Sequence, residues 1–152
     1  MAIERVLLAV SSEEEERIEK IGGFTADVAA PTGAEVTLAH VFASDGYDDL
    51  KQRLEFAPDD DVSPDTVAKR SVAVRDLTAL LDEADVDYTV RGRTADSGAV
   101  GGEIVDLAEE ADADLVVVGG RKRSPTGKAV FGSTAQEVML EAPCPVTFVR
   151  NE

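Results

Sequence analysis

Short apolar runs and helical patterns alternate along the whole chain. The runs that predict strands combine β-branched and aliphatic residues over about four to eight positions, as strands of a buried sheet do. They cover Glu4–Val10, Glu35–Phe42, Val86–Arg91, Leu115–Val118 and Pro145–Val149. The first and fourth runs are continuously apolar, which is typical of strands covered on both faces.

Between these runs, apolar residues recur at the spacing of an amphipathic helix. The predicted helices are Glu14–Ala30, Asp65–Glu83, Gly101–Ala111 and Ser133–Leu140. A cap at Ser63 followed by Pro64 marks the start of the second helix, and Gly33 suits the end of the first. The segment Ala43–Asp61 is long, irregular and acidic, which predicts a lid or a variable insertion.

Strands that alternate with helices predict an α/β fold with a mostly parallel sheet. Right-handed crossovers then place helices on both faces of the sheet. Ligands of such sheets bind beyond the carboxyl ends of the strands, where the strand order reverses. We therefore expect a binding site among the segments that follow Val10, Phe42 and Val118. Residues 1–152 are expected to form one domain.

Composition restricts the partners and the compartment. The chain has 31 acidic and 15 basic residues, a formal net charge of −16, so neither nucleic acid nor a membrane surface is an expected partner. Such acidity resembles that of proteins from salt-loving organisms. No apolar run reaches the roughly 18–20 residues of a membrane span, and the N-terminus lacks a secretory signal. Because Cys144 is the only cysteine, we expect no internal disulfide and a soluble cytoplasmic protein.

One segment reverses the charge pattern. Four cations fall within eight residues that contain no acid: Arg121, Lys122, Arg123 and Lys128. The rest of the chain has 11 basic and 31 acidic residues, a balance of −20. A local charge of +4 in that background would attract an anion to this segment.

The backbone of the same segment also suits an anion. Its glycines permit unusual conformations or a close approach to a ligand, and they are Gly119, Gly120, Gly127 and Gly132. Ser133 and Thr134 then open a helix, whose first N–H groups attract phosphate. Two alternatives stay open: the hydroxyls could serve as capping boxes, Thr134 with Glu137 and Ser133 with Gln136, and the cations could pair with acidic groups. A phosphate-loop NTPase motif is excluded, because Lys122 and Ala129 stand where it needs glycine and a hydroxyl.

These motifs resemble a known family. Val116-Val117-Val118-Gly119-Gly120-Arg121, then Gly127, Phe131-Gly132-Ser133 and Ala142-Pro143-Cys144-Pro145-Val146 are similar to the C-terminal half of universal stress protein domains. The order of elements extends the resemblance over the whole chain. It implies a five-stranded parallel sheet with strand order 3-2-1-4-5, and a homodimer that pairs through the last strand, Pro145–Arg150. Some members bind ATP between strands one and four, and others bind no nucleotide.

The resemblance also implies two groups of site residues. The phosphate side would be Gly119, Gly120, Arg121, Lys122, Gly127, Lys128, Gly132, Ser133 and Thr134. The nucleoside side would be Ala9, Val10, Ser11 and Val41. The chain departs from the pattern of the nucleotide binders at two of these positions: Lys122 replaces a glycine, and Ser11 replaces an aspartate.

Other reactive residues predict no catalysis. His40, on an apolar strand, is expected to be a structural histidine, and Cys144 to be a buried, inert thiol. Arg91-Gly92-Arg93 would either add positive potential near the phosphates or form a turn. A Mg²⁺ ion bound with the nucleotide could use the loop acids Asp45, Asp48 and Asp49.

Three functions are compatible with these residues. The first is an ATP-binding or related adenine-nucleotide-binding stress-response protein that acts as a regulatory dimer. The second is an interaction module of the same fold that binds no nucleotide and docks an acidic partner on its basic loop. The third, a slow ATP hydrolase, has the least support, because no general base stands beside a nucleophile in the sequence.

Overall fold

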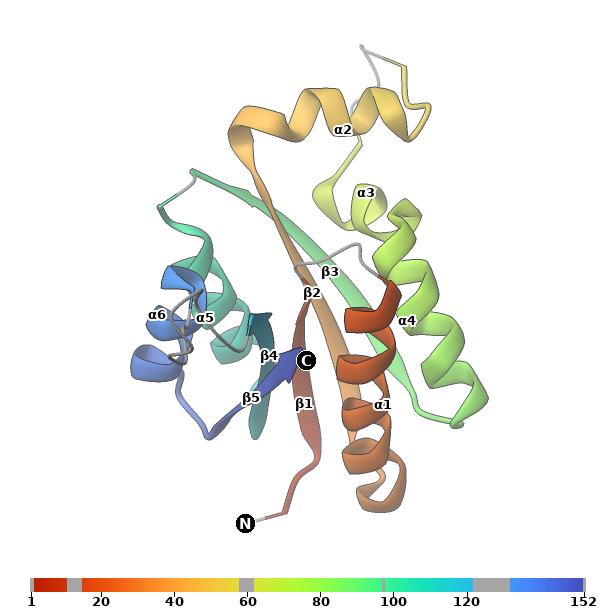
Figure 1. Ribbon diagram of the computed structural model, residues 1–152, viewed down its shortest axis with the longest axis vertical. Helices are drawn as coiled ribbons and strands as arrows, with labels where there is room; N and C mark the ends of the chain where they lie inside the picture. Colours follow the sequence, from red (N-terminus) through yellow and green to blue (C-terminus); the bar gives the residue numbers. More distant parts are fainter. Residues whose placement is uncertain (1, 11–14, 58–61, 97, 122–131, 152) are drawn as a thin grey trace.

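The computed structural model describes residues 2–10, 15–57, 62–96, 98–121 and 132–151. Five strands form one parallel sheet in the order β3-β2-β1-β4-β5 (Figure 1). They are β1 (Arg5–Val10), β2 (Glu35–Ala43), β3 (Tyr88–Ala95), β4 (Leu115–Arg121) and β5 (Val146–Asn151). The predicted α/β class and strand order are confirmed.

Helices cover both faces of this sheet. One face carries α1 (Glu15–Thr32), α3 (Pro64–Arg70) and α4 (Val72–Glu83), and the other carries α5 (Val100–Glu110) and α6 (Ser133–Glu141). The short turn η1 (Ser44–Gly46) and helix α2 (Tyr47–Arg53) follow β2 and lie beyond its carboxyl end. No helix in the described ranges is both long and apolar enough to cross a bilayer.

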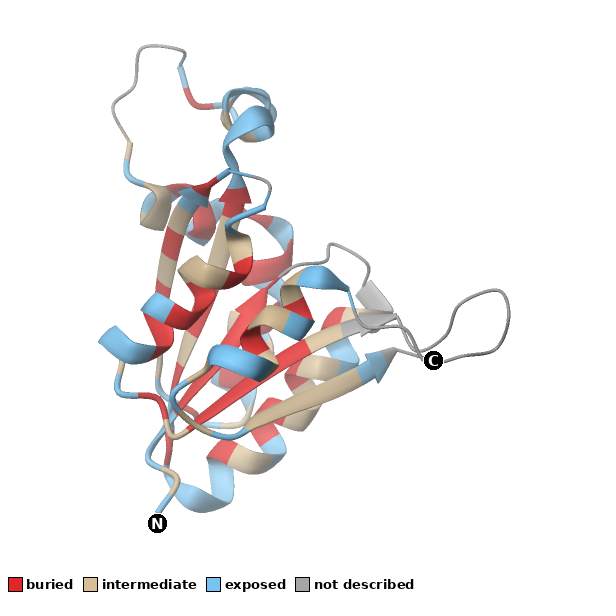
Figure 2. Cartoon of the chain, turned by 90° about the vertical axis from the view of Figure 1, so that its left-hand side faces the viewer, coloured by how far each residue is buried: buried red, intermediate tan, exposed pale blue. Residues whose placement is uncertain are grey.

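Alternating side chains of the strands build two separate cores. On β1, Val6, Leu8 and Val10 pack with α1 and α4, whereas Leu7 and Ala9 pack with α5 and α6. All five are buried, which is why the central strands appear red in Figure 2. We call the two sides of the sheet the α1/α4 face and the α5/α6 face, and each core takes the name of its face. Residues on the same face can share a site.

The helix predicted over Asp65–Glu83 is two helices. Ser71 interrupts it with an extended backbone (ψ 147°), and its hydroxyl accepts a hydrogen bond from the N–H of Val74 at 3.3 Å. A serine that caps a new helix competes with continuation of the old one, so the single-helix prediction was wrong. The predicted cap at Ser63 is confirmed by its bond from the N–H of Thr66.

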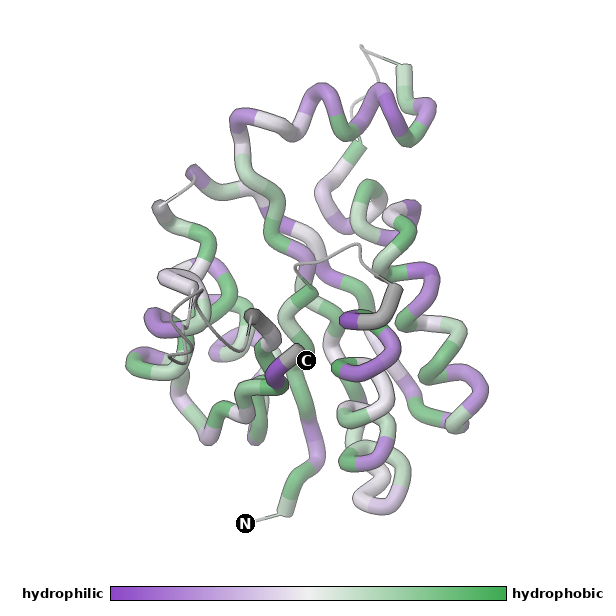
Figure 3. Tube along the Cα trace, viewed as in Figure 1, coloured by the Kyte–Doolittle hydropathy of each residue, from purple (hydrophilic) through white to green (hydrophobic). Residues whose placement is uncertain are grey.

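Part of the connection predicted to be irregular is helical. Within Ala43–Asp61, residues Tyr47–Arg53 form α2, and Tyr47, Leu50 and Leu54 pack against the α1/α4 core at helical spacing. Hydrophilic residues occupy the positions between them (Figure 3). Residues 58–61 lie outside the described ranges.

Helix α3 closes the outer edge of β3. Gly92 of β3 lies against α3 so closely that a Cβ atom would come within 2.1 Å of the Pro64 carbonyl oxygen. The N–H of Gly92 donates to the Asp65 carboxylate at 2.6 Å. This edge of the sheet therefore has a partner within its own chain.

Candidate functional site

Strands β1 and β4 separate toward their carboxyl ends. Among the described residues, their pairing ends at Leu8 and Val117, although β1 continues to Val10 and β4 to Arg121. The pairing of β1 with β2, in contrast, continues to Val10 and His40. From this point α1 leaves toward one face of the sheet and α6 lies on the other. The opening is the topological switch point at which parallel sheets bind ligands.

The N-terminus of α6 follows β4 in the chain and has no side-chain cap. Gly132 occupies the cap position (φ −61°, ψ 157°), and no cap side chain accepts a hydrogen bond there. Ser133 and Thr134 are the first two residues inside the helix, so neither stands at the cap position that the alternative of a capping box requires. Among the described residues, no side chain caps the first N–H groups of α6, which form the positive end of the helix dipole and attract anions.

Two glycines of the predicted phosphate set have different physical roles. Gly119 lies within β4 with an ordinary backbone, and a Cβ atom there would come within 3.1 Å of the Ile21 side chain of α1. The sequence allowed Gly119 a conformation closed to other residues, but its backbone does not use that freedom, and its small size serves packing instead. At Gly132 a Cβ atom would meet nothing within 4 Å. Among the described residues, nothing therefore occupies the space beside the Gly132 Cα atom at the start of α6.

The predicted nucleoside residues divide between the two faces. Ala9 and Val41 belong to the α5/α6 face, which also carries α6, and Val41 is half-buried. Val10 is buried among residues of the α1/α4 face instead. Ala9 and Val41 can therefore share a wall with α6, while the Val10 side chain is part of the core.

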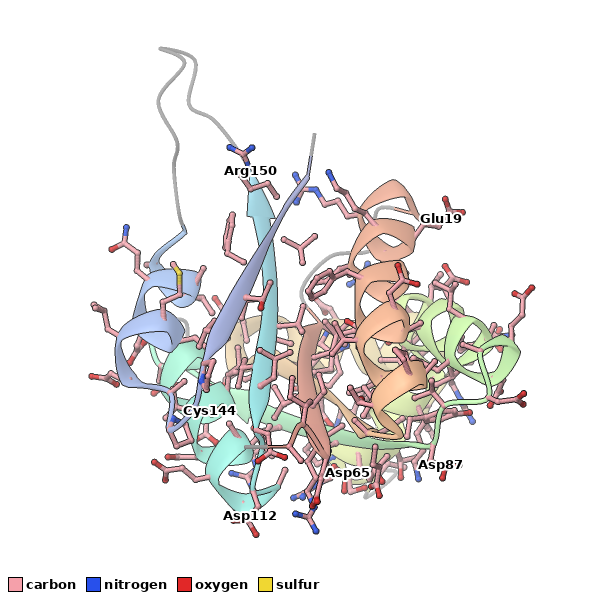
Figure 4. All side chains as sticks on the ribbon, turned by 90° about the horizontal axis from the view of Figure 1, so that it is seen from below. Glu19, Asp65, Asp87, Asp112, Cys144 and Arg150 are labelled. Carbon is pink, nitrogen blue, oxygen red and sulfur yellow. The ribbon has the colours of Figure 1, made fainter. Side chains whose placement is uncertain are left out.

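Several predicted site residues lie outside the described ranges: Ser11, Lys122, Gly127 and Lys128. The backbones of Gly120 and Arg121 belong to β4 and stand in register with Arg150 and Asn151 of β5. Arg150, which the sequence reasoning counted only as part of the dimer strand, lies exposed at this carboxyl edge (Figure 4). The predicted strand Pro145–Val149 is followed directly by this cation, and that position could have identified Arg150 as a candidate site residue.

Arg91 and Arg93 do not contribute to this opening. Both belong to β3, which is separated from β4 by β2 and β1. Arg93 bonds Glu103 and Glu110, and Arg91 lies 3.6 Å from Asp65 and 3.7 Å from Glu110. The hydrogen bonds that Arg93 donates to the Glu110 carboxylate raise the pKa of Arg93. Arg91-Gly92-Arg93 is therefore part of a strand and not a turn. Carboxylates match both arginines, so their charge does not add to the positive potential of the candidate phosphate site.

His40 is held as a structural residue. Its ring stacks on Phe42 with centroids 4.2 Å apart, and its Nδ1 lies 3.5 Å from the Ser71 hydroxyl. Burial lowers the pKa of His40 from 6.5 to about 4, so the ring is neutral at pH 7. Cys144 is half-buried rather than buried, and burial together with Asp114 raises the pKa of its thiol. A protonated thiol is a weak nucleophile.

The acids considered for Mg²⁺ do not form a metal-binding group. Within the described residues, no set of three or more His, Cys, Asp or Glu side chains is placed to hold a metal ion. Asp48 pairs with Lys51 at 3.5 Å on the outside of α2.

Comparison with known proteins gives one family. The model described as "Universal stress protein family" matches residues 2–150. The chain is 36% identical over 81 residues (53% of its length) to the universal stress protein of Mycolicibacterium smegmatis. It is 37% identical over 101 residues (66% of its length) to a universal stress protein of Thermus aquaticus. The chain spans 61% of the length of each of these two relatives.

Solved structures resemble the whole chain. A universal stress protein from Archaeoglobus fulgidus is 25% identical, with a TM-score of 0.69 over 97% of this chain and 98% of that one. A structure from the same organism, in complex with dAMP, is 21% identical with a TM-score of 0.67 over 99% of this chain and 100% of that one. A universal stress protein in complex with cAMP is 17% identical, with a TM-score of 0.64 over 100% of both chains.

Proposed function

Because the chain belongs to the universal stress protein family, we propose that it binds an adenine nucleotide, ATP or a close relative, and acts as a regulatory dimer. The observation that carries this proposal is the opening between β1 and β4 beside the uncapped start of α6. Solved relatives are described in complex with dAMP and with cAMP, which supports the choice of an adenine nucleotide.

The described residues fit the two ends of such a ligand. The N–H groups that open α6, with the hydroxyls of Ser133 and Thr134, would bind phosphate, and the space beside Gly132 leaves room for it. The cations Arg121, Lys122 and Lys128 would add charge from the sequence between β4 and α6. Ala9 and Val41 would border the nucleoside on the same face as α6. Mg²⁺, if it enters with ATP, would be held by the phosphates.

The dimer would form on β5. This strand is at the end of the sheet, and its apolar residues Val146, Phe148 and Val149 are only half-buried. A second copy could cover them and pair with the outer edge of the strand. Sedimentation of Val146→Asp should show monomers, with circular dichroism confirming that the variant is folded. A folded variant that stays dimeric would reject pairing through β5.

A thermal-shift titration with ATP, AMP and inorganic phosphate, at one fixed ionic strength, tests the nucleotide proposal. ATP at about 100 times its Kd should raise the Tm by roughly 5–10 °C. Gly132→Val should reduce this shift without lowering the Tm of the free protein, because its side chain enters open space. Lys122→Glu should reduce it by repelling the phosphates.

Gly98→Val is the matched control. Gly132 is the cap residue of α6, and Gly98 lies one residue before the cap residue of α5. Among the described residues, a Cβ atom at Gly98 also meets nothing within 4 Å. It should leave the ATP shift unchanged. Equal shifts from phosphate and ATP, or no shift with either, would favour the interaction module that docks an acidic partner. Release of radiolabelled phosphate from ATP would instead support a slow hydrolase.

A further inference from the structure

A pocket lies between β2 and α2. Its volume is about 210 Å³, and its lining includes His40, Phe42, Tyr47, Arg53 and Ser71. With about 30 Å³ for each water molecule, this space corresponds to roughly seven waters, too little for a nucleotide. A planar molecule of about nine non-hydrogen atoms would fit.

This pocket lies mainly on the other face of β2 from the opening between β1 and β4, although Val41 also lines it. Successive side chains of a strand point to opposite faces, so His40 and Phe42 face away from Val41. Phe42, Tyr47 and Leu50 pack with the α1/α4 core, whereas Val41 packs with the core that contains α6. A ligand held among His40, Phe42 and Tyr47 would therefore lie on the other side of β2 from α6.

The polar groups of the pocket are mainly hydrogen-bond donors. The Tyr47 hydroxyl is buried and has no partner within the described residues. The Ser71 oxygen accepts from the N–H of Val74, and its own hydrogen can be donated to Nδ1 of His40. That arrangement leaves the ring hydrogen of His40 on Nε2, as a further donor. A ligand that offers acceptors would satisfy these groups.

Arg53 supplies a positive charge at the same pocket. Of the two cations on α2, Lys51 already pairs with Asp48 at 3.5 Å. The structure gives Arg53 no carboxylate partner among the described residues, although the surrounding chain is strongly acidic. A guanidinium binds a carboxylate in a planar, two-point geometry.

The remaining wall is aromatic. The rings of His40 and Phe42 are stacked, and the Phe42 and Tyr47 rings lie 5.5 Å apart. Such surfaces favour a flat, apolar body. From the pocket size, the donors, the cation and the aromatic wall together, we propose that the pocket between β2 and α2 binds a small aromatic carboxylate.

Benzoate is the probe that tests this site. In ¹H–¹⁵N NMR titrations of the full chain at fixed ionic strength, benzoate should shift the amides of η1, α2 and Ser71, with a Kd on the order of 1 mM. Benzyl alcohol, which has the ring without the charge, should bind at least about tenfold more weakly. Three results would overturn the proposal. Benzoate could shift the amides at the start of α6 instead, or benzyl alcohol could bind equally well. Benzoate at 20 mM, on the order of 20 times that Kd, could also cause no shifts.

Three variants assign the contacts. Arg53→Gln should weaken benzoate about tenfold or more, and Tyr47→Phe, which keeps the ring, about three- to fivefold. Lys51→Gln, on the same helix, should leave the Kd within about twofold. The dispersion of each NMR spectrum reports whether the variant is folded. An unchanged Kd in folded Arg53→Gln would reject the site, whereas ATP binding, measured separately, tests only the opening beside α6.

Discussion

The two ends of the sheet differ in the partners that their described residues have within the chain. Asp65 accepts from the edge backbone at Gly92, and Glu103 and Glu110 match the arginines of β3. At the other end, within the described residues, no side chain caps α6, and β5 pairs with β4 on one side but with no strand on its outer side.

This contrast separates groups that stabilise the fold from groups that are available for binding. A buried donor without a partner is unfavourable by about 1–3 kcal/mol, so a chain normally satisfies its polar groups. Both β3 and β5 are edge strands, but among the described residues only β3 has a helix of the same chain that bonds its backbone, through Gly92 and Asp65 of α3. We therefore expect substitutions at the β3 end to change stability and substitutions at the β4–β5 end to change binding.

The largest expected effect comes from filling the contact between β3 and α3. Gly92→Val would place side-chain atoms where the Pro64 carbonyl lies, 2.1 Å from the first of them. We expect a loss of about 3 kcal/mol or more in the free energy of unfolding, measured by urea titration. Gly98→Val, with open space around it, should lose little. Equal midpoints for the two variants would show that α3 does not close this edge.

The second effect is a dependence of stability on pH through His40. Burial holds the pKa of the folded-state ring near 4, while the ring of the unfolded chain takes up a proton near pH 6.5. The stability contributed by the neutral ring is therefore complete above about pH 6.5 and is lost as the pH falls toward 4.

Between pH 7 and pH 5 this loss should amount to about 2 kcal/mol. Urea unfolding of the wild type and of His40→Gln at both pH values measures it, since the titration of the carboxylates is common to both proteins. The stability of the variant should fall by about 2 kcal/mol less. Parallel pH profiles would contradict the burial of His40.

The smallest effect compares the two helix starts that carry serine. Ser71→Ala should lower the free energy of unfolding by about 1 kcal/mol, because the hydroxyl caps α4. Ser133→Ala should change it by less than about 0.5 kcal/mol, because no side chain caps α6. It should nevertheless reduce the thermal shift caused by ATP. Equal losses of stability would mean that Ser133 is a structural cap.

The apolar pattern was sufficient to predict the order of strands and helices, because short, aliphatic runs such as Val6–Val10 are typical of a strand covered on both faces. The break at Ser71 was missed because apolar spacing continues across it and the cap depends on a local hydrogen bond. The partners of Arg91 and Arg93 could not be predicted, because Glu103 and Glu110 meet them only after α5 packs beside β3.

At the candidate site, the sequence identified the loop that joins β4 to α6 but not the task of each residue in it. Gly119 and Gly132 look equivalent in the sequence, yet one makes room for Ile21 and the other borders open space. The pocket between β2 and α2 was not predicted, because it forms only where α2, β2 and Ser71 come together in the folded chain.

The closure of β3 by α3 also limits how far this sheet can be extended. A sheet with two open edges can add strands at both, and copies joined in that way form fibres. Here the carbonyl of Pro64 and the carboxylate of Asp65 occupy the approach to Gly92. If a second copy pairs on β5 as proposed, the joined sheet would end at a β3 strand covered by α3 on each side, which predicts that association stops at two chains.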